Sequence, residues 1–374
     1  MFALLAKARE MERSGSRIVH LEIGDPDFSS PDNVINAAKK ALDGGLTHYV
    51  NSMGMMEFRQ AIVEYITTNY GFTPDVNQVL VCPANAIIDF TVRCVANPGD
   101  EIIYPDPGFP TYHSVIVYNG MKPVGIQLKE ENLFQMDPAA VRKNITDKTR
   151  LIIINSPQNP TGSVMSQDEI LAIAKIAAEE DIYLLTDEVY SRLIYNAQHY
   201  SPSVVDCCRE RTVILNSLSK VYSMSGWRLG YAVGPEKLIG KMGLLLQTII
   251  SCLPGFTQSA GITALSIDRG FVEQRVKVLK QRRDLLISGL NSLPGVSCLS
   301  PEGAFYAFAN IKNTGMTSEE YSDKLLACAG VCVLPGNCFG RFGEGFIRLC
   351  YASLSFSAIE EALDKMKRFH AGIS

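Results

Sequence analysis

The chain lacks a hydrophobic run long enough to cross a membrane. Its longest apolar stretch, residues 243–253, contains Gln247 and is far shorter than the roughly 20 apolar residues that a membrane-spanning helix needs. The first 13 residues include Lys7, Glu10 and Glu12, so they predict an amphipathic helix rather than a signal peptide. We therefore expect a cytoplasmic protein that is neither secreted nor inserted in a membrane.

An excess of charge of one sign is also missing. The 374 residues include 35 basic and 39 acidic side chains, which gives a net charge of -4. A chain without a general positive excess has no electrostatic basis for holding nucleic acid or an anionic membrane surface. The glycine patterns of nucleotide-binding loops follow none of the predicted strands. Small molecules are the expected binding partners.

The chain contains cysteines, but they do not show the paired spacing that is typical of zinc sites. The ten cysteines lie within apolar runs such as residues 331–333, where a thiol packs as a small hydrophobic group. The closest pairs, Cys207 with Cys208 and Cys328 with Cys332, do not match the C-x-x-C spacing of zinc sites. We expect reduced cysteines and no metal site.

What the chain does contain is a regular alternation of helical patterns with short apolar runs. Between residue 30 and about residue 270 this alternation predicts βαβ units and a mainly parallel sheet between helices, an α/β fold. The runs are near-continuously apolar, as expected for strands covered on both faces. The predicted strands are Gln78–Cys82, Glu101–Tyr104, Leu151–Ile154, Ile182–Thr186, Thr212–Asn216 and Leu229–Val233.

Two helices carry clear boundary signals. Ser30 and Pro31 are expected to be the N-cap and the first-turn proline of a helix that ends at Gly44. Ser166 and Glu169 are expected to form a capping box.

The pattern changes after residue 270. A long charged helix near residues 271–293 is followed by predicted strands at 303–308, 331–334 and 346–350. We therefore expect two domains: a large domain at residues 36–275, and a smaller α+β domain formed by residues 1–35 and 276–374.

The strongest chemical signal follows one of the predicted strands, where ligands bind in open α/β sheets. Residues 216–230 read NSLSKVYSMSGWRLG. The amine of Lys220 can form an imine with an aldehyde, while Ser217, Ser219 and Arg228 hold a phosphate group. For Lys220 alone, a solvated lysine on a polar loop is the alternative.

A carboxylate ends the preceding predicted strand. Asp187 follows the apolar run at 182–186, and a carboxylate buried there needs a cationic partner or takes up a proton. A protonated pyridine nitrogen is such a partner, and Tyr190 would hydrogen-bond a phenolic oxygen of the same ring. Alone, the Asp-Glu pair is more typical of a helix cap or a metal ligand.

Two proline-rich turns follow other predicted strands. Asn159 lies in NSPQNPTG, residues 155–162, where prolines hold it extended so that its amide can point at a ligand. Phe109 lies in YPDPGFPTY, residues 104–112, and offers an aromatic face for stacking on a flat ring. Alone, the first motif is more typical of a plain β-turn, and the second equally typical of a hydrophobic loop.

An arginine interrupts the last predicted strand. Arg348 lies within GFIRLC, residues 345–350, where an unpaired guanidinium is costly. Its planar fork suits a carboxylate. We expect Arg348 to bind the carboxylate of a substrate, with a structural salt bridge as the alternative.

Taken together, these motifs resemble the class I/II aminotransferases of pyridoxal 5′-phosphate (PLP) fold type I, and the aspartate aminotransferases among them. Order and spacing agree, with gaps of 28 residues from 159 to 187, 33 from 187 to 220 and 8 from 220 to 228. The resemblance begins at LEIGDPDF, residues 21–28, continues through residues 49–59 and reaches Arg348. The set is specific, although no single motif is.

The resemblance implies roles around the cofactor ring. Lys220 would carry PLP as a Schiff base, and Asp187 would pair with its pyridine nitrogen. Asn159 and Tyr190 would hold its phenolic oxygen, and Phe109 would stack on the ring.

The resemblance also implies a phosphate site. Ser217, Ser219 and Arg228 lie at the phosphate positions of the family. Tyr49 matches a tyrosine that reaches the phosphate of the neighbouring subunit, which implies a homodimer with shared active sites.

One region departs from the family pattern. The segment CPANAI, residues 82–87, is one residue shorter than the usual phosphate turn. A helix that begins at about Asn85 would still present free amides to the phosphate, so we retain Ala84, Asn85 and Ala86 as ligands. The absence of a lysine from this turn weakens an aspartate-specific interpretation.

The expected activity is transfer of an amino group from an L-amino acid to a 2-oxo acid by a ping-pong mechanism. Arg348 and Gly24 would hold the substrate, and Lys220 would move the α-proton. We expect the imine linkage and Arg228 to lower the pKa of Lys220. Phe28, Tyr112 and Phe305 either line an aromatic or apolar substrate pocket or pack in the core.

Two other functions are compatible with parts of this pattern. A PLP-dependent lyase would use the same lysine for β-elimination of cysteine conjugates. A PLP-sensing transcriptional regulator would need an N-terminal DNA-binding module, for which the roughly 20 residues before Leu21 are too few.

Overall fold

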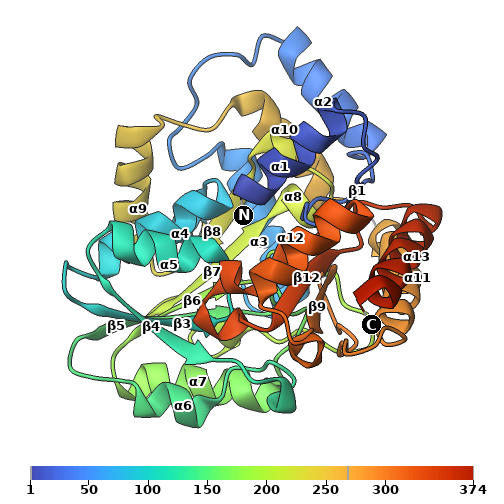
Figure 1. Cartoon of the computed structure of the whole chain (residues 1–374). Helices are drawn as coiled ribbons and strands as arrows, with labels where there is room; N and C mark the ends of the chain where they lie inside the picture. The colour runs from blue at the N-terminus through green and yellow to red at the C-terminus, as the bar shows by residue number, and fades with distance from the viewer. Residues whose placement is uncertain (1, 268, 374) are drawn as a thin grey trace.

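The computed structural model describes residues 2–267 and 269–373 (Figure 1). At its centre is a seven-stranded sheet in the order β2-β8-β7-β6-β5-β3-β4. The strands are β2 (Val79–Val81), β3 (Glu101–Asp106), β4 (Lys122–Gln127), β5 (Thr149–Asn155), β6 (Tyr183–Asp187), β7 (Thr212–Ser217) and β8 (Gly230–Val233). Strand β8 pairs antiparallel with β2 and β7, and the other neighbouring strands pair in parallel. The predicted mainly parallel sheet is confirmed.

All six strands predicted for this sheet are present, but β4 was not predicted. Its sequence, KPVGIQ, contains Pro123 and Gly125, and most of it is partly or fully exposed. A strand at the edge of a sheet tolerates proline and does not need a continuous apolar run. The periodicity that indicates a buried strand is therefore weak here.

Helices cover both faces of the sheet (Figure 1). On one side lie α4 (Ala84–Val95), α5 (Pro110–Tyr118) and α9 (Glu236–Ile249), and on the other α6 (Pro138–Lys143) and α7 (Gln167–Glu179). Alternate residues of β5 join different cores: Leu151 and Ile153 join one, and Ile152 and Ile154 join the other. This alternation explains why the strand is apolar throughout.

The remaining strands form two small sheets. The first has the order β11-β12-β9 and contains β9 (Tyr306–Asn310), β11 (Leu334–Pro335) and β12 (Phe346–Cys350). The second pairs β1 (Val19–His20) with β10 (Val331–Cys332) in parallel.

The remaining helices are α1 (Phe2–Arg13), α2 (Asp32–Asp43), α3 (Met56–Tyr70), α8 (Leu218–Val221), α10 (Gly255–Leu265), α11 (Arg269–Leu290), α12 (Ser318–Ala329) and α13 (Phe356–Ile373). Helix α1 confirms the predicted N-terminal helix, apart from Met1, which lies outside the described residues. Helix α11 corresponds to the predicted long charged helix.

The helix signals are confirmed in part. Ser166 and Glu169 form the predicted capping box of α7, and Gly44 ends α2. The prediction that Ser30 caps α2 is wrong, because Pro31 occupies the N-cap position. The Ser30 hydroxyl instead donates to the carbonyl of Ser223 at 2.7 Å.

Two expectations from composition also bear on the structure. All ten cysteines are free. Among the helices that the structure describes, none is both long and apolar enough to span a bilayer.

Candidate active site

A cavity of about 370 Å³ lies where β5, β6 and β7 end. The N-terminal segment, the first residues of α4 and α5, and β12 complete its wall. Twelve of the fourteen site residues predicted from the sequence line it: Gly24, Ala84, Asn85, Phe109, Asn159, Asp187, Tyr190, Ser217, Ser219, Lys220, Arg228 and Arg348. Ala86 and Tyr49 are not among the lining residues.

Lys220 lies on a short helix at the end of β7. Ser217 ends the strand and caps α8 by accepting a hydrogen bond from the Ser219 amide at 3.1 Å. The Lys220 ammonium donates to the carbonyl of Gly24, across the cavity, at 2.6 Å. The position of Lys220 is thus fixed by a strand, a cap and a contact with the N-terminal segment.

Burial lowers the pKa of Lys220. Desolvation is the largest cause, and the positive charges of Arg348 and Arg228 act in the same direction, against Asp25 and Cys350. The expected direction is therefore confirmed, but burial outweighs Arg228 as its cause. An amine with a lowered pKa is more often unprotonated, which suits a nucleophile or a base.

Asp187 ends β6 and is buried, with 4% of its surface exposed. It accepts hydrogen bonds from the Tyr112 hydroxyl at 2.5 Å and from the Val189 amide at 3.3 Å. Desolvation raises the pKa of Asp187 to about 6, with no positive charge among the described residues to oppose it. A carboxylate in this position is suited to a cationic ligand.

Asn159 is oriented by its neighbours. Its backbone amide donates to the side-chain oxygen of Asn155 at 3.0 Å, and its own side-chain oxygen accepts from Arg348 Nη1 at 3.2 Å. Because the oxygen is occupied, the NH2 group of Asn159 is left to donate into the cavity. The peptide bonds before Pro157 and Pro160 are cis, which the sequence did not indicate.

Arg348 lies in β12 and is buried. Nη1 donates to Asn159, Nη2 donates to the carbonyl of Glu22 at 2.5 Å, and buried Nε has no hydrogen-bond partner among the described residues. The guanidinium lies 4.5 Å from the ring centre of Tyr306 and 4.9 Å from that of Phe339. Its described partners are thus neutral oxygens and rings, and its charge is free to bind an anion.

The start of α4 forms one wall of the cavity. The helix begins at Ala84, one residue earlier than expected, and Ala84 and Asn85 line the cavity. The amide of Ala86 instead donates to the carbonyl of Pro83 at 2.9 Å. The structure therefore leaves the amides of Ala84 and Asn85 for an anion, and gives no support to Ala86.

Comparison with known proteins agrees with this geometry. The family model "Aminotransferase class I and II" matches residues 16–366. The chain is 40% identical to an aspartate aminotransferase of Pyrococcus horikoshii over 370 residues, which cover 97% of this chain and 94% of that protein. The chain belongs to the class I and II aminotransferases.

Other similar aminotransferases differ in their named substrates. The aromatic-amino-acid aminotransferase 2 of Thermococcus litoralis is 36% identical, over 94% of this chain and 91% of that protein. The structure of an alanine aminotransferase from Pyrococcus furiosus superposes with a TM-score of 0.95 at 33% identity, over 99% of this chain and 96% of that one. This likeness confirms the fold expected for the aminotransferase and leaves its donor open.

Sequence reasoning missed several lining residues of this aminotransferase. Tyr306 has its hydroxyl 2.8 Å from that of Tyr190, and a side chain at Gly24 would collide with it, since an added Cβ would lie 2.5 Å from the Tyr306 oxygen. Glu22 and Ser225 also line the cavity. Glu22 and Ser225 lie within the motifs at residues 21–28 and 216–230, and Tyr306 lies outside the motifs. Nothing in the sequence singles out these three residues, and only their closeness to Gly24, Arg228 and Arg348 in space marks them.

The three aromatic residues that the sequence suggested for a substrate pocket lie outside the cavity of the aminotransferase. Phe28, Tyr112 and Phe305 are not among the lining residues. Phe305 is fully buried against the ring of Tyr190, and Tyr112 holds Asp187. Phe28 is partly buried against the core. Contacts within the chain therefore explain these three side chains without a substrate.

Proposed function

We propose that this aminotransferase is PLP-dependent and binds its cofactor covalently through Lys220. One observation carries the proposal. A single cavity combines an amine whose pKa is lowered with a buried carboxylate that has no described cationic partner. An aldehyde that carries a protonated ring nitrogen satisfies both groups at once.

The remaining donors of the cavity fit the rest of such a cofactor. The NH2 group of Asn159 and the hydroxyl of Tyr190 would hold the phenolic oxygen, and Phe109 would lie against the ring. The phosphate would be held by the first amides of α4, by Ser217 and Ser219, and by Arg228. The start of α4 can approach β8 closely because residue 230 is a glycine. An added Cβ there would lie only 2.9 Å from the Cys82 carbonyl oxygen and 3.3 Å from the Ala84 nitrogen.

PLP, when bound, supplies an electron sink for the bonds to the α-carbon of an amino acid. The chain supplies the rest. Arg348 would hold the α-carboxylate with the hydrogens that its present bonds leave free, and the carbonyl of Gly24 would position the amine of Lys220. Lys220, once released as a free amine, would move the α-proton from the substrate to the cofactor in the first half of a ping-pong cycle, and would move a proton in the opposite direction in the second half.

The substrates would be an L-amino acid and a 2-oxo acid. The cationic side chains that line the cavity in the described part of the chain are Lys220, Arg228 and Arg348, and each already has a role. The apolar side chains of Leu5, Ile23, Leu334 and Phe339 also face the cavity. This composition favours amino donors with an apolar or aromatic side chain over aspartate.

We also propose that the enzyme is a homodimer with shared active sites. Tyr49 is 87% exposed and lies away from its own cavity, which is expected if it reaches the phosphate bound by the other subunit. Tyr118, which is 79% exposed, provides a matched control. Tyr49→Phe should weaken PLP binding while Tyr118→Phe should not, and light scattering should give the mass of a dimer.

The division into domains and the location in the cell belong to the same proposal. The seven-stranded sheet lies between residues 79 and 233, and the two small sheets use residues 19–20 and 306–350. This separation supports a large domain at 36–275 and a small one at 1–35 and 276–374. Free cysteines are typical of proteins in the reducing cytoplasm.

The decisive experiment replaces the proposed anchor. The variant Lys220→Ala should lose the imine absorbance that borohydride reduces, and transamination should fall by about 10⁴-fold or more. The exposed Lys241 of α9 provides a control, since Lys241→Ala should retain both. An intact, reducible imine band in Lys220→Ala would show that the assignment is wrong.

A second measurement separates transamination from elimination. A panel of L-amino acids should react only when 2-oxoglutarate or pyruvate is present as acceptor. Release of ammonia and pyruvate from a cysteine conjugate without any acceptor would identify a lyase instead.

A further inference from the structure

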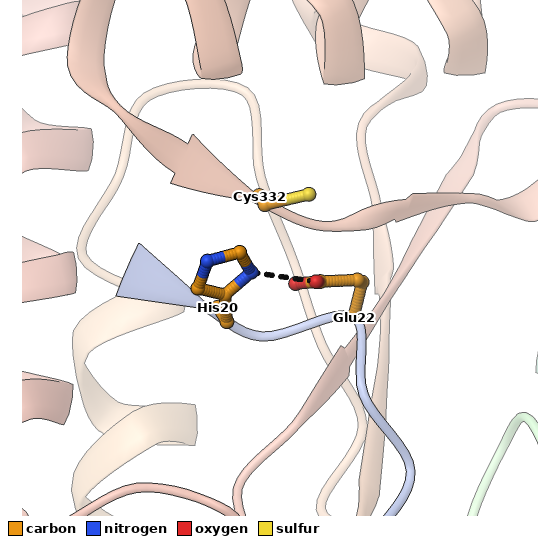
Figure 2. Close-up of side chains that lie close together, drawn as sticks. All are labelled: His20, Glu22 and Cys332. Atoms are coloured by element: carbon orange, nitrogen blue, oxygen red, sulfur yellow. Dashed lines mark hydrogen bonds and ion pairs between the residues drawn. The ribbon is translucent and has the colours of Figure 1, made fainter. Parts of the chain in front are cut away.

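Three potential metal ligands meet where β1 pairs with β10 (Figure 2). His20 lies opposite Cys332 in the parallel register, so the two side chains project from the same face of the strand pair. Glu22 follows two residues after His20 and returns to that face. One ligand atom from each of the three residues lies within 4.8 Å of the other two.

Glu22 has an unused ligand atom in this cluster. Only 5% of Glu22 is exposed. Its Oε1 lies 2.7 Å from His20 Nδ1 (Figure 2), and its carboxylate also interacts with the Cys332 thiol. Its Oε2 is buried and has no hydrogen-bond partner of good geometry among the described residues. A buried carboxylate oxygen without a partner is costly unless a cation or a donor joins it.

The other ring nitrogen of His20 is also held. Nε2 lies 3.0 Å from Oε1 of Glu12, which α1 brings from outside the cluster. A histidine that binds a metal through one nitrogen almost always donates its other N–H to a carboxylate or a carbonyl, and this contact fixes the ring and strengthens the ligand. Glu12 therefore provides the carboxylate contact that usually holds the second nitrogen of a metal-bound histidine.

We propose that Nδ1 of His20, a carboxylate oxygen of Glu22 and Sγ of Cys332 bind a zinc ion, with a water molecule as the fourth ligand. Nitrogen, oxygen and sulfur ligands in tetrahedral geometry are those that zinc prefers. Binding would release two protons, one from the thiol and one from Nδ1, while Nε2 keeps its proton and donates to Glu12. The thiolate and the carboxylate then balance the two charges of the ion.

The geometry requires a modest local adjustment. Ligand atoms around a tetrahedral zinc ion are roughly 3.4–3.8 Å apart, from bonds of about 2.0–2.3 Å, so the side chains must close slightly from their present spacing and give up the contact between His20 and Glu22. His20 is 24% exposed, which provides an entry path. The ion would join β1 to β10.

This site lies beside the catalytic cavity but is distinct from it. Of the three ligands, only Glu22 lines the cavity, and its carbonyl accepts the hydrogen bond from Arg348. The carbonyl of Gly24, two residues later, accepts from Lys220. A bound ion would thus fix residues 22–24, whose carbonyls accept the hydrogen bonds of Arg348 and Lys220.

The test is zinc binding by the PLP-loaded enzyme, measured by equilibrium dialysis after treatment with a chelator. We expect one tightly bound zinc ion per chain and a rise of a few degrees in Tm at saturating zinc. Cobalt in place of zinc should give a thiolate-to-cobalt absorption band. Binding should weaken by more than about 100-fold in Cys332→Ser, and the cobalt band should disappear.

Two further variants keep the test decisive. Glu12 is exposed and lies outside the ion's ligand sphere, so Glu12→Gln should fold normally and weaken zinc binding by about 10–100-fold. Cys298→Ser, at a buried cysteine elsewhere, should leave binding unchanged. The proposal is overturned if the wild-type enzyme binds no zinc, if Glu12→Gln and Cys332→Ser bind it as tightly as the wild type, or if Cys298→Ser weakens binding equally.

Discussion

Asp187 and Glu188 are adjacent, buried and acidic, yet their side chains differ in how many hydrogen-bond donors surround them. Glu188 is completely buried, and four groups surround its oxygens. These are the hydroxyls of Tyr70 at 2.7 Å, Ser201 at 2.5 Å and Thr186 at 2.9 Å, and Nε2 of His199 at 3.0 Å. Asp187, on the cavity side, has one hydroxyl and one backbone amide.

The difference shows that burial alone does not distinguish a functional carboxylate from a structural one. A carboxylate has about four acceptor positions. Glu188 fills them within the protein, so its role is to tie β6 to its neighbours. Asp187 leaves positions free, and burial raises its pKa because the described residues supply no cationic partner to oppose the desolvation.

Among the changes that test this contrast between Asp187 and Glu188, the largest effect is expected from removing the unfilled carboxylate. Asp187→Asn should lower transamination by about 10²–10⁴-fold, because loss of one partner from a buried ion pair costs about 3–5 kcal/mol. Stability without cofactor should be unchanged or higher. Steady-state kinetics measure the activity, and thermal unfolding measures the stability. An Asp187→Asn enzyme with full activity would show that Asp187 is a structural carboxylate like Glu188.

The same carboxylate predicts how the stability of the cofactor-free protein depends on pH. Folded Asp187 keeps its proton up to about pH 6, whereas in the unfolded chain it loses the proton near its ordinary value of about 3.9. Between these values the folded state binds more protons, so its stability should fall by up to about 3 kcal/mol as pH rises from about 4 to 6. Denaturant titrations at several pH values should show this fall, and Asp187→Asn should remove it.

Replacement of Glu188, whose acceptor positions are filled, should lower stability rather than activity. Glu188→Gln replaces an acceptor with an amide whose hydrogens face existing donors, so the free energy of unfolding should fall by roughly 1.5–3 kcal/mol. The kcat of the folded enzyme should change little. A large loss of kcat with unchanged stability would mean that Glu188 belongs to the active site.

The smallest effect is expected at the hydroxyl pair of Tyr190 and Tyr306. Tyr306→Phe removes one hydrogen bond, worth about 0.5–1.5 kcal/mol, so kcat/KM should fall by about 2–10-fold with little change in Tm. A loss as large as that of Asp187→Asn would show that the Tyr306 hydroxyl contacts the reacting atoms.

The sequence predicted the parts of this site that depend on short-range patterns. Lys220, Asp187 and Asn159 lie at the end of a buried strand or within four residues after it. Apolar runs therefore mark their places in the sequence, and parallel strands end at one edge of the sheet. Tyr306 was missed because it reaches the cavity from β9, in a separate sheet, and Glu22 because it lies in the segment after β1, outside the strands. The partners of Asp187 and Glu188 were equally hidden, since neighbouring acids look alike until the fold shows which groups surround each.

The pairing of β7 with β8 has a consequence for how the site assembles. Ser217 pairs with Gly230, so the loop that carries Lys220 and Arg228 is closed at its base by residues only 13 apart. The contacts of Arg348 span 189 residues to Asn159 and 326 to Glu22. Because closing a long loop costs more entropy than closing a short one, we expect the loop that carries Lys220 to form early in folding and Arg348 to reach its place last.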